Sequence, residues 1–159
     1  MAKVNQVIWN KTYGDKIKFL ETAEDSNGEL LKFELSCVAD GEGPPLHYHP
    51  VQSESFEVVK GELSIIYDGK KTVLGPGNKL TVEANSPHKW HNEGSEDLVC
   101  IIKLKPALKT EYFLESVYSL DVQGKTNKET GLPSTLQFAA ILNECYGELF
   151  LVGPPIPAQ

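Results

Sequence analysis

The sequence predicts a mainly β protein, an antiparallel sandwich or barrel that is followed by helices near the C-terminal end. Apolar and polar residues alternate from about residue 29 to about residue 104, turn sequences interrupt them at short intervals, and the spacing becomes helical after about residue 110. Period two is typical of a strand with one buried face. Many short strands of this kind, joined by tight turns, favour a sandwich or barrel.

The alternation is clearest in residues 31–37, where every odd position is apolar and every even position is polar. Further strands are expected at 54–58, 63–67, 80–82 and 98–104. The turns between them contain glycine, proline and aspartate, which adopt the backbone conformations that tight turns need. They fall at 40–45, 60–61, 68–69 and 75–77.

A helical extension is expected over about 111–146. Its first helix is indicated by residues that recur at helical spacing, namely Tyr112, Phe113, Ser116, Val117 and Leu120. A second helix is expected at 135–145, with Ser134 as its N-cap. The apolar, proline-rich segment 149–159 either docks on the barrel or continues into a longer protein.

Length and composition suit one soluble domain, 1–159, that fills the whole chain. The net charge is −7, with 15 Lys and Arg against 22 Asp and Glu, and no basic block is present, so a nucleic-acid partner is not expected. The sequence shows no apolar stretch of the kind found in signal peptides or membrane spans, so a cytoplasmic location and no membrane association are expected.

Three cysteines, Cys37, Cys100 and Cys145, are widely spaced, and two of them lie in strand-like runs. Reduced core thiols are the favoured interpretation; a disulfide or a thiolate ligand is the alternative.

The histidines indicate a metal site. His47 and His49 are two residues apart, so on a strand both leave the same face. Glu54 alternates with Phe56 and Val58 and should therefore face the core, where a carboxylate needs a cation or hydrogen-bond partners. His88 follows about thirty residues later, and antiparallel strands could bring it beside the first pair.

Two sequence motifs resemble those of the cupin superfamily, in particular its small single-domain metal-binding members with an RmlC-like jelly roll. The first motif is Gly41-x5-His47-x-His49-x4-Glu54-x6-Gly61, complete at every defined position. The second is Gly77-x5-Glu83-x-Asn85-x2-His88-x3-Asn92, in which the family usually has Pro where this chain has Glu83 and Gly where it has Asn85. Asn tolerates the left-handed backbone that the Gly provides, whereas the role of Glu83 is not explained.

The resemblance implies a double-stranded β-helix, or jelly-roll, cupin barrel over about 29–104 and one divalent metal ion, Fe, Mn, Ni, Cu, Co or Zn. The implied ligands are His47, His49, Glu54 and His88. His88 is preferred to His91 because it fits the spacing of the motif and because Trp90 should share its inward face. His91 is expected at the surface.

The inward residues predicted from the alternation are apolar: by default they form the core, and some should also form the wall of a substrate pocket. The candidates for this wall are Phe33, Leu35, Phe56, Val58, Ile65 and Trp90. No His/Asp or Lys/Tyr dyad is evident on inward positions outside the metal ligands, which counts against sugar epimerases and isomerases.

Two classes of function remain open at the level of the sequence. One is a metal-dependent oxidoreductase, most simply a quercetinase-like dioxygenase that acts on a small aromatic or enolic substrate, with Glu54 as the catalytic base. The other is a non-catalytic cupin that binds or senses a small molecule, and the expected ligand of either class is anionic or enolic. A homodimer is expected, with the outward residues Ile66, Val99 and Ile101 as a candidate interface; burial under the chain's own helices is the competing explanation.

Overall fold

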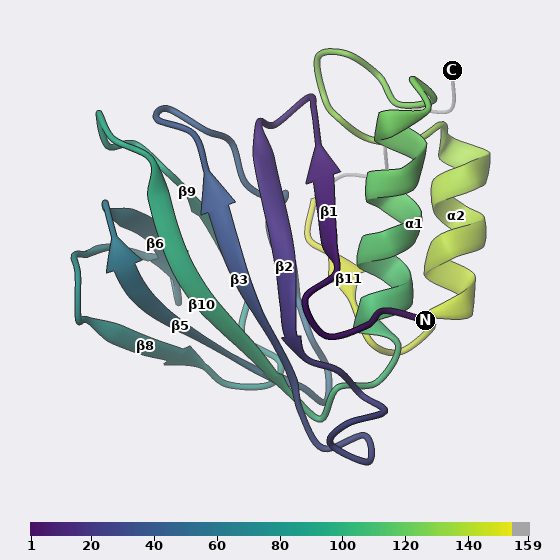
Figure 1. Ribbon diagram of the computed structural model, residues 1–159, viewed down its shortest axis with the longest axis horizontal. Coiled ribbons are helices and arrows are strands. Elements are labelled where there is room, and N and C mark those ends of the chain that lie inside the picture. Colours follow the sequence, from purple (N-terminus) through teal and green to yellow (C-terminus); the bar gives the residue numbers. More distant parts are fainter. Residues whose placement is uncertain (154–159) are drawn as a thin grey trace.

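Two antiparallel sheets face each other in the computed structural model, which describes residues 1–153, and two helices lie side by side next to the first strand (Figure 1). The predicted mainly β fold with C-terminal helices is confirmed. The chain order of the strands is interleaved between the sheets, so neighbours in space are often distant in sequence.

The larger sheet has six strands in the order β1-β2-β3-β10-β5-β8. These are β1 (Val7–Asn10), β2 (Asp15–Glu21), β3 (Leu31–Cys37), β10 (Leu98–Lys105), β5 (Ser53–Lys60) and β8 (Lys79–Val82). The smaller sheet has five strands in the order β11-β4-β9-β6-β7. These are β11 (Phe150–Leu151), β4 (His47–Tyr48), β9 (His88–His91), β6 (Leu63–Tyr67) and β7 (Lys70–Leu74).

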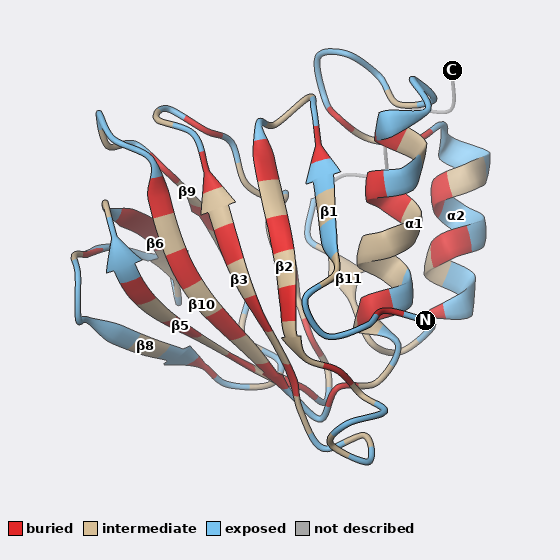
Figure 2. Ribbon diagram, in the orientation of Figure 1, coloured by how far each residue is buried: buried red, intermediate tan, exposed pale blue. Residues whose placement is uncertain are grey.

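The alternation in the sequence becomes alternating burial along the strands, visible as stripes on β3 and β10 in Figure 2. The inward side chains of β3, including Phe33 and Leu35, are almost fully buried, and those of β10, including Ile102, pack beside them. Burial of each such side chain contributes about 1.5–3 kcal/mol. The strict period therefore determines which face of the sheet lines the interior.

Two strands, β1 and β2, precede the barrel that the sequence indicated and extend the larger sheet. Ile17 and Phe19 on β2 are buried and alternate with lysines, a signal that is present in the sequence. The third inward position of this strand is occupied by Asp15, a buried carboxylate.

The helices are α1 (Thr110–Val122) and α2 (Thr135–Glu144). The hydroxyl of Ser134 accepts a hydrogen bond from the backbone N–H of Gln137, so the predicted N-cap is confirmed. The helix α1 packs against β1 and against α2 (Figure 1). Neither helix in residues 1–153 has the length and apolar character that crossing a membrane requires.

The segment after α2 returns to the smaller sheet, where β11 pairs with β4. Phe150 lies opposite Tyr48, their rings stacked with centroids 5.5 Å apart, and Leu151 lies opposite His47. The described part of this segment therefore docks on the barrel. Residues 154–159 lie outside the described residues.

The three cysteines are buried free thiols. Burial raises the pKa of Cys37 and of Cys100 to about 12, so neither is a thiolate near neutral pH. This agrees with the interpretation as reduced core residues.

Ile66, Val99 and Ile101 are half-buried. The main contact of α1 with the larger sheet is at β1, not at β10, which carries two of these residues. A homodimer through this face stays a prediction.

Close packing around Gly43 gives a test of the fold. A Cβ atom at Gly43 would lie 1.9 Å from the carbonyl oxygen of Trp90, so β9 or the loop before β4 would have to move. We expect Gly43→Ala to lower the free energy of unfolding by about 2 kcal/mol or more. Gly75→Ala is the matched control, because its nearest non-neighbouring atom would be 3.9 Å away. Urea unfolding measures both, and equal stability of the two variants would contradict this account.

Candidate metal centre

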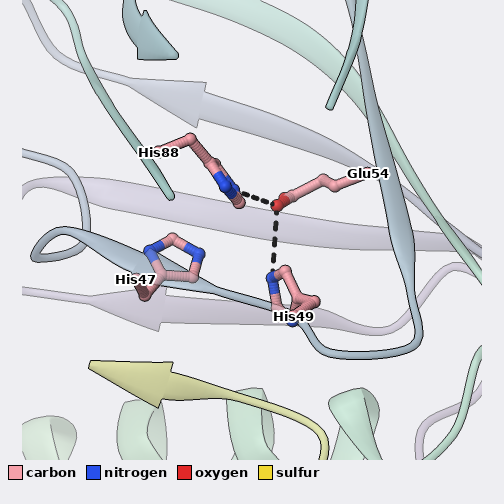
Figure 3. Close-up of side chains that lie close together, drawn as sticks. All are labelled: His47, His49, Glu54 and His88. Atoms are coloured by element: carbon pink, nitrogen blue, oxygen red, sulfur yellow. Dashed lines mark hydrogen bonds and ion pairs between the residues drawn. The ribbon is translucent and has the colours of Figure 1, made fainter. Parts of the chain in front are cut away.

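Four side chains that were predicted as metal ligands meet inside the barrel (Figure 3). His47 on β4 and His88 on β9 lie directly opposite each other in the strand pairing, and their rings are 4.4 Å apart. His49 follows the end of β4, and Glu54 reaches in from β5 in the other sheet. One nitrogen or oxygen from each residue lies within 4.8 Å of the others, and all four residues are buried.

Each histidine ring is fixed by a backbone carbonyl on its Nδ1 side. Nδ1 lies 2.8 Å from the carbonyl oxygen of Pro45 in His47 and 3.0 Å from that of Ser86 in His88. In His49 the acceptor is the carbonyl of Glu148, 3.0 Å away, just before β11. A carbonyl oxygen only accepts, so each Nδ1 carries the proton and donates it.

This tautomer leaves Nε2 of each neutral ring as a lone-pair donor, which is the form that binds metal ions. Oε2 of Glu54 lies 2.8 Å from Nε2 of His88 and 3.4 Å from Nε2 of His49. A lone pair and a carboxylate oxygen at these distances repel each other unless a proton or a metal cation lies between them. The arrangement therefore requires positive charge at its centre.

The acid–base properties of the cluster follow from the same contacts. Burial by itself would raise the pKa of Glu54, but the hydrogen bonds from His49 and His88 outweigh it and hold the pKa well below its usual range. Burial lowers the pKa of His47 to about 4, so this ring is neutral near neutral pH. Burial also lowers the pKa of His49, but the hydrogen bond to Glu54 opposes this effect, and the pKa is raised above its usual value.

The donor set fits a divalent transition metal. Three imidazole nitrogens and one carboxylate oxygen suit Fe²⁺, Mn²⁺, Co²⁺, Ni²⁺, Cu²⁺ or Zn²⁺. Glu54 is ionised, and the fixed Nδ1–H tautomers make Nε2 of each ring the atom that would bind a metal, with release of any proton that it carries. The four residues are thus a candidate metal site within a buried polar cluster.

The other residues of the second motif, Glu83, Asn85 and Asn92, differ in their contacts and burial. Asn85 has a φ of 64°, the left-handed conformation expected at this position, and its N–H donates to the carbonyl of His49. The side chain of Asn92 is buried and donates to the carbonyls of Val38 and Glu96. Glu83 is exposed and lies in the turn before Asn85.

His91 points away from the cluster, as predicted. Its Nε2 lies 2.6 Å from a carboxylate oxygen of Glu93, and its side chain is partly exposed. Among the described residues the metal-ligand cluster contains the other three histidines and not this one.

An apolar cavity opens from the metal-ligand cluster, with His47, His49 and Glu54 in its wall. Three of the expected wall residues, Phe33, Leu35 and Trp90, line it. Phe56, Val58 and Ile65 are buried but do not line it. Phe56 instead packs edge-on against His88, with ring centroids 6.3 Å apart, two positions after Glu54 on the same face of β5.

Both helices and the C-terminal strand contribute to the same cavity, which the sequence pattern did not indicate. Most of their lining residues are apolar, among them Phe113, Leu114, Val117, Phe138 and Leu151, with Leu149 directly before β11. The helical extension is therefore part of the wall of the candidate ligand site. The apolar spacing in α1 is the signal that could have revealed it.

A polar pair that the sequence did not reveal also lines the cavity. The hydroxyl of Tyr118 on α1 donates to Oδ2 of Asp15 on β2 at 2.7 Å, and both side chains are buried. Burial raises the pKa of Asp15 to about 6, against the opposing effect of the Tyr118 hydrogen bond. This Asp–Tyr pair is neither a His/Asp nor a Lys/Tyr dyad, and the sequence pattern did not indicate it.

Comparison with known proteins agrees with this architecture. Residues 34–102 match the family model described as the cupin domain. An RmlC-like cupin from Shewanella frigidimarina has a similar structure, with a TM-score of 0.58 and 22% identity, over 70% of this chain and 92% of that chain. A predicted oxalate decarboxylase from Thermotoga maritima superimposes with a TM-score of 0.55 and 18% identity, over 58% of this chain and 80% of that chain. The chain therefore contains a domain of the cupin superfamily.

Two curated proteins are similar in sequence. A probable oxidoreductase, virH, of Hypocrea virens is 31% identical over 134 residues, which are 81% of this chain and 57% of that protein. Quercetin 2,3-dioxygenase of Bacillus subtilis is 27% identical over 78 residues, 49% of this chain and 23% of that protein. The chain thus spans between about a quarter and just over half of the length of these relatives.

The buried carboxyl of Asp15 predicts a pH dependence of stability. It titrates near 3.8 when exposed and near 6 in the folded protein, so between these values the folded form holds more protons than the unfolded form. Stability should therefore fall as pH rises through this window, by up to about 3 kcal/mol. Asp15→Asn removes this titration and keeps an oxygen acceptor for Tyr118.

Urea unfolding of metal-free wild type and D15N between acidic and neutral pH checks this expectation. The stability of the wild type relative to D15N should decrease with rising pH, since the other groups contribute equally to both proteins. A difference that is constant with pH would show that Asp15 is not a perturbed buried carboxyl.

Proposed function

We propose that this chain is a metal-dependent oxidoreductase, most simply a dioxygenase, that acts on a small aromatic or enolic substrate. The observation that carries the proposal is a buried cluster of three histidines and one glutamate that opens into an apolar cavity. Such a cavity binds a largely apolar molecule and directs a polar oxygen of that molecule to the charged end formed by these ligands.

His47, His49, Glu54 and His88 would hold the metal ion. A bound divalent ion would supply Lewis-acid chemistry, because its positive charge lowers the pKa of an enol, phenol or water that it binds. The single carboxylate neutralises only part of that charge, so an anionic oxygen of the substrate is favoured next to it.

The chain's own residues provide orientation, water exclusion and a base. The three carbonyl acceptors fix the histidine rings, and the apolar wall from β3, α1 and α2 excludes water from the cavity. Glu54 is the strongest candidate for the base, since it is ionised, buried and part of the cavity wall. In this role Oε2 accepts the proton of a substrate hydroxyl.

The overall reaction needs no other reductant. In a dioxygenase both atoms of O₂ are incorporated into the substrate, which is oxidised while O₂ is reduced. The similarity to quercetin 2,3-dioxygenase and to the probable oxidoreductase virH supports oxidation chemistry, over the part of each protein that the chain matches.

Oxygen uptake tests the proposal. Protein reconstituted separately with Fe²⁺, Mn²⁺, Co²⁺, Ni²⁺ or Cu²⁺ should consume O₂ when quercetin or 3-hydroxyflavone is added. Glu54→Gln should lower the turnover of the metal-loaded protein by roughly 10²- to 10⁴-fold, because an amide cannot accept the proton. Metal content is measured in the same samples.

Glu57→Gln is the matched control, since Glu57 lies on the same strand, faces outward and pairs with Lys79 at the surface. It should keep full activity. An E54Q protein with both metal and full activity would exclude Glu54 as the base. Tight binding of these compounds without O₂ uptake, whichever metal is present, would instead identify a non-catalytic binding protein.

A further inference from the structure

We propose that Asp15 and Tyr118 form a second polar subsite of the cavity, in which Asp15 accepts a hydrogen bond from a hydroxyl or N–H group of the ligand. The subsite does not involve the metal ligands. It deepens the proposed function, because it assigns a second polar group to the molecule that the cavity binds.

The carboxyl group of Asp15 has one oxygen without a hydrogen-bond partner among the described residues. Oδ2 of Asp15 is bound by the hydroxyl of Tyr118, whereas Oδ1 is buried and has no hydrogen-bond partner among residues 1–153. A buried carboxylate oxygen without a partner is costly, and proteins rarely leave one unsatisfied without a reason. A donor on a bound ligand would satisfy it.

The position of Asp15 in the fold also favours a ligand-binding role, because its side chain faces the cavity. Asp15 shares the inward face of β2 with Ile17, and both line the cavity together with Tyr118. Asp15 pairs with Cys37 of β3, and Cys37 pairs with Leu98 at one end of β10, whereas Glu54 pairs with Leu104 near the other end. Asp15 and Glu54 therefore lie toward opposite ends of β10 in the strand register, and both line the cavity.

The wall between these ends is apolar and includes Ile17, Phe33, Leu35 and Ile102. A ligand that reaches both ends is therefore elongated and mainly apolar, with an oxygen for the metal-ligand end and an O–H or N–H donor for Asp15. This chemistry excludes a purely hydrocarbon molecule and a ligand with a second anionic group, which the Asp15 carboxylate would repel.

A purely structural role for the pair is the competing explanation. The Tyr118–Asp15 hydrogen bond joins α1 to β2 and would help to dock the helix. That role uses only Oδ2 and gives no reason for Oδ1 to prefer ligands with a donor. The decisive readout is therefore ligand preference and not stability.

The experiment compares carbazole with fluorene, which have nearly the same shape but differ in the N–H donor; the carbazole N–H donates and does not accept. Their affinities for metal-free protein are measured near neutral pH by fluorescence titration, and the measurement is repeated on metal-loaded protein. Wild-type protein should bind carbazole about tenfold more tightly, since hydrogen bonds to a charged acceptor have about this effect.

Asp15→Asn should remove this preference, because its amide N–H₂ can occupy the position of Oδ1 and offers no acceptor there. The matched control is Glu34→Gln, the same chemical change on the outward face of β3. It should leave the preference unchanged. On the wild type, NMR shifts caused by carbazole should be largest at Asp15 and Tyr118, a result that does not depend on the folding of D15N.

A preference that persists in D15N, equal affinities in the wild type, or no binding of either probe would overturn the subsite. Because the titrations on metal-free protein need no metal, these results are independent of the proposed oxidoreductase activity. A metal-loaded protein that consumes no O₂ but keeps the D15N-sensitive preference would leave the subsite intact and refute only the enzymatic function.

Discussion

The site depends on one electrostatic constraint, the close approach of Glu54 to the Nε2 atoms of His88 and His49. Because Nδ1 of each ring donates to a backbone carbonyl, the groups that face one another at the centre are lone pairs and a carboxylate. Such a cluster is stable in a buried setting only with a shared cation or with added protons. The metal-free and metal-bound forms must therefore differ in their protonation, and metal binding must release protons.

This constraint also explains why the fold is closed around the site. His47 and His88 belong to the smaller sheet, and His49 directly follows its strand β4. Glu54 belongs to the larger sheet, so a cation at the centre joins both sheets. The carbonyl of Glu148 fixes His49, and it is held by the pairing of β11 with β4. The C-terminal segment is thus a structural part of the metal site as well as of the cavity wall.

The sequence alone predicts the features that depend on residues close together in the chain. Residues 31–37 alternate strictly, and His47 and His49 share a face because they are two residues apart, so the main strands and the ligand candidates could be predicted. The Asp15–Tyr118 pair could not, since its members are 103 positions apart and meet only when α1 docks beside β1. Phe56 was assigned to the pocket from its alternation, which gives the face of a residue but not its depth in the barrel.

Elemental analysis of protein purified without an affinity tag or chelator tests the central claim most directly. The account predicts about one equivalent of a divalent transition metal in the wild type, and its loss in His49→Ala, because four ligands define one site. His91→Ala should keep the metal, since His91 pairs with Glu93 outside the cluster. A wild-type protein that holds no metal and takes up none on reconstitution would contradict the account, as would equal metal loss in both variants.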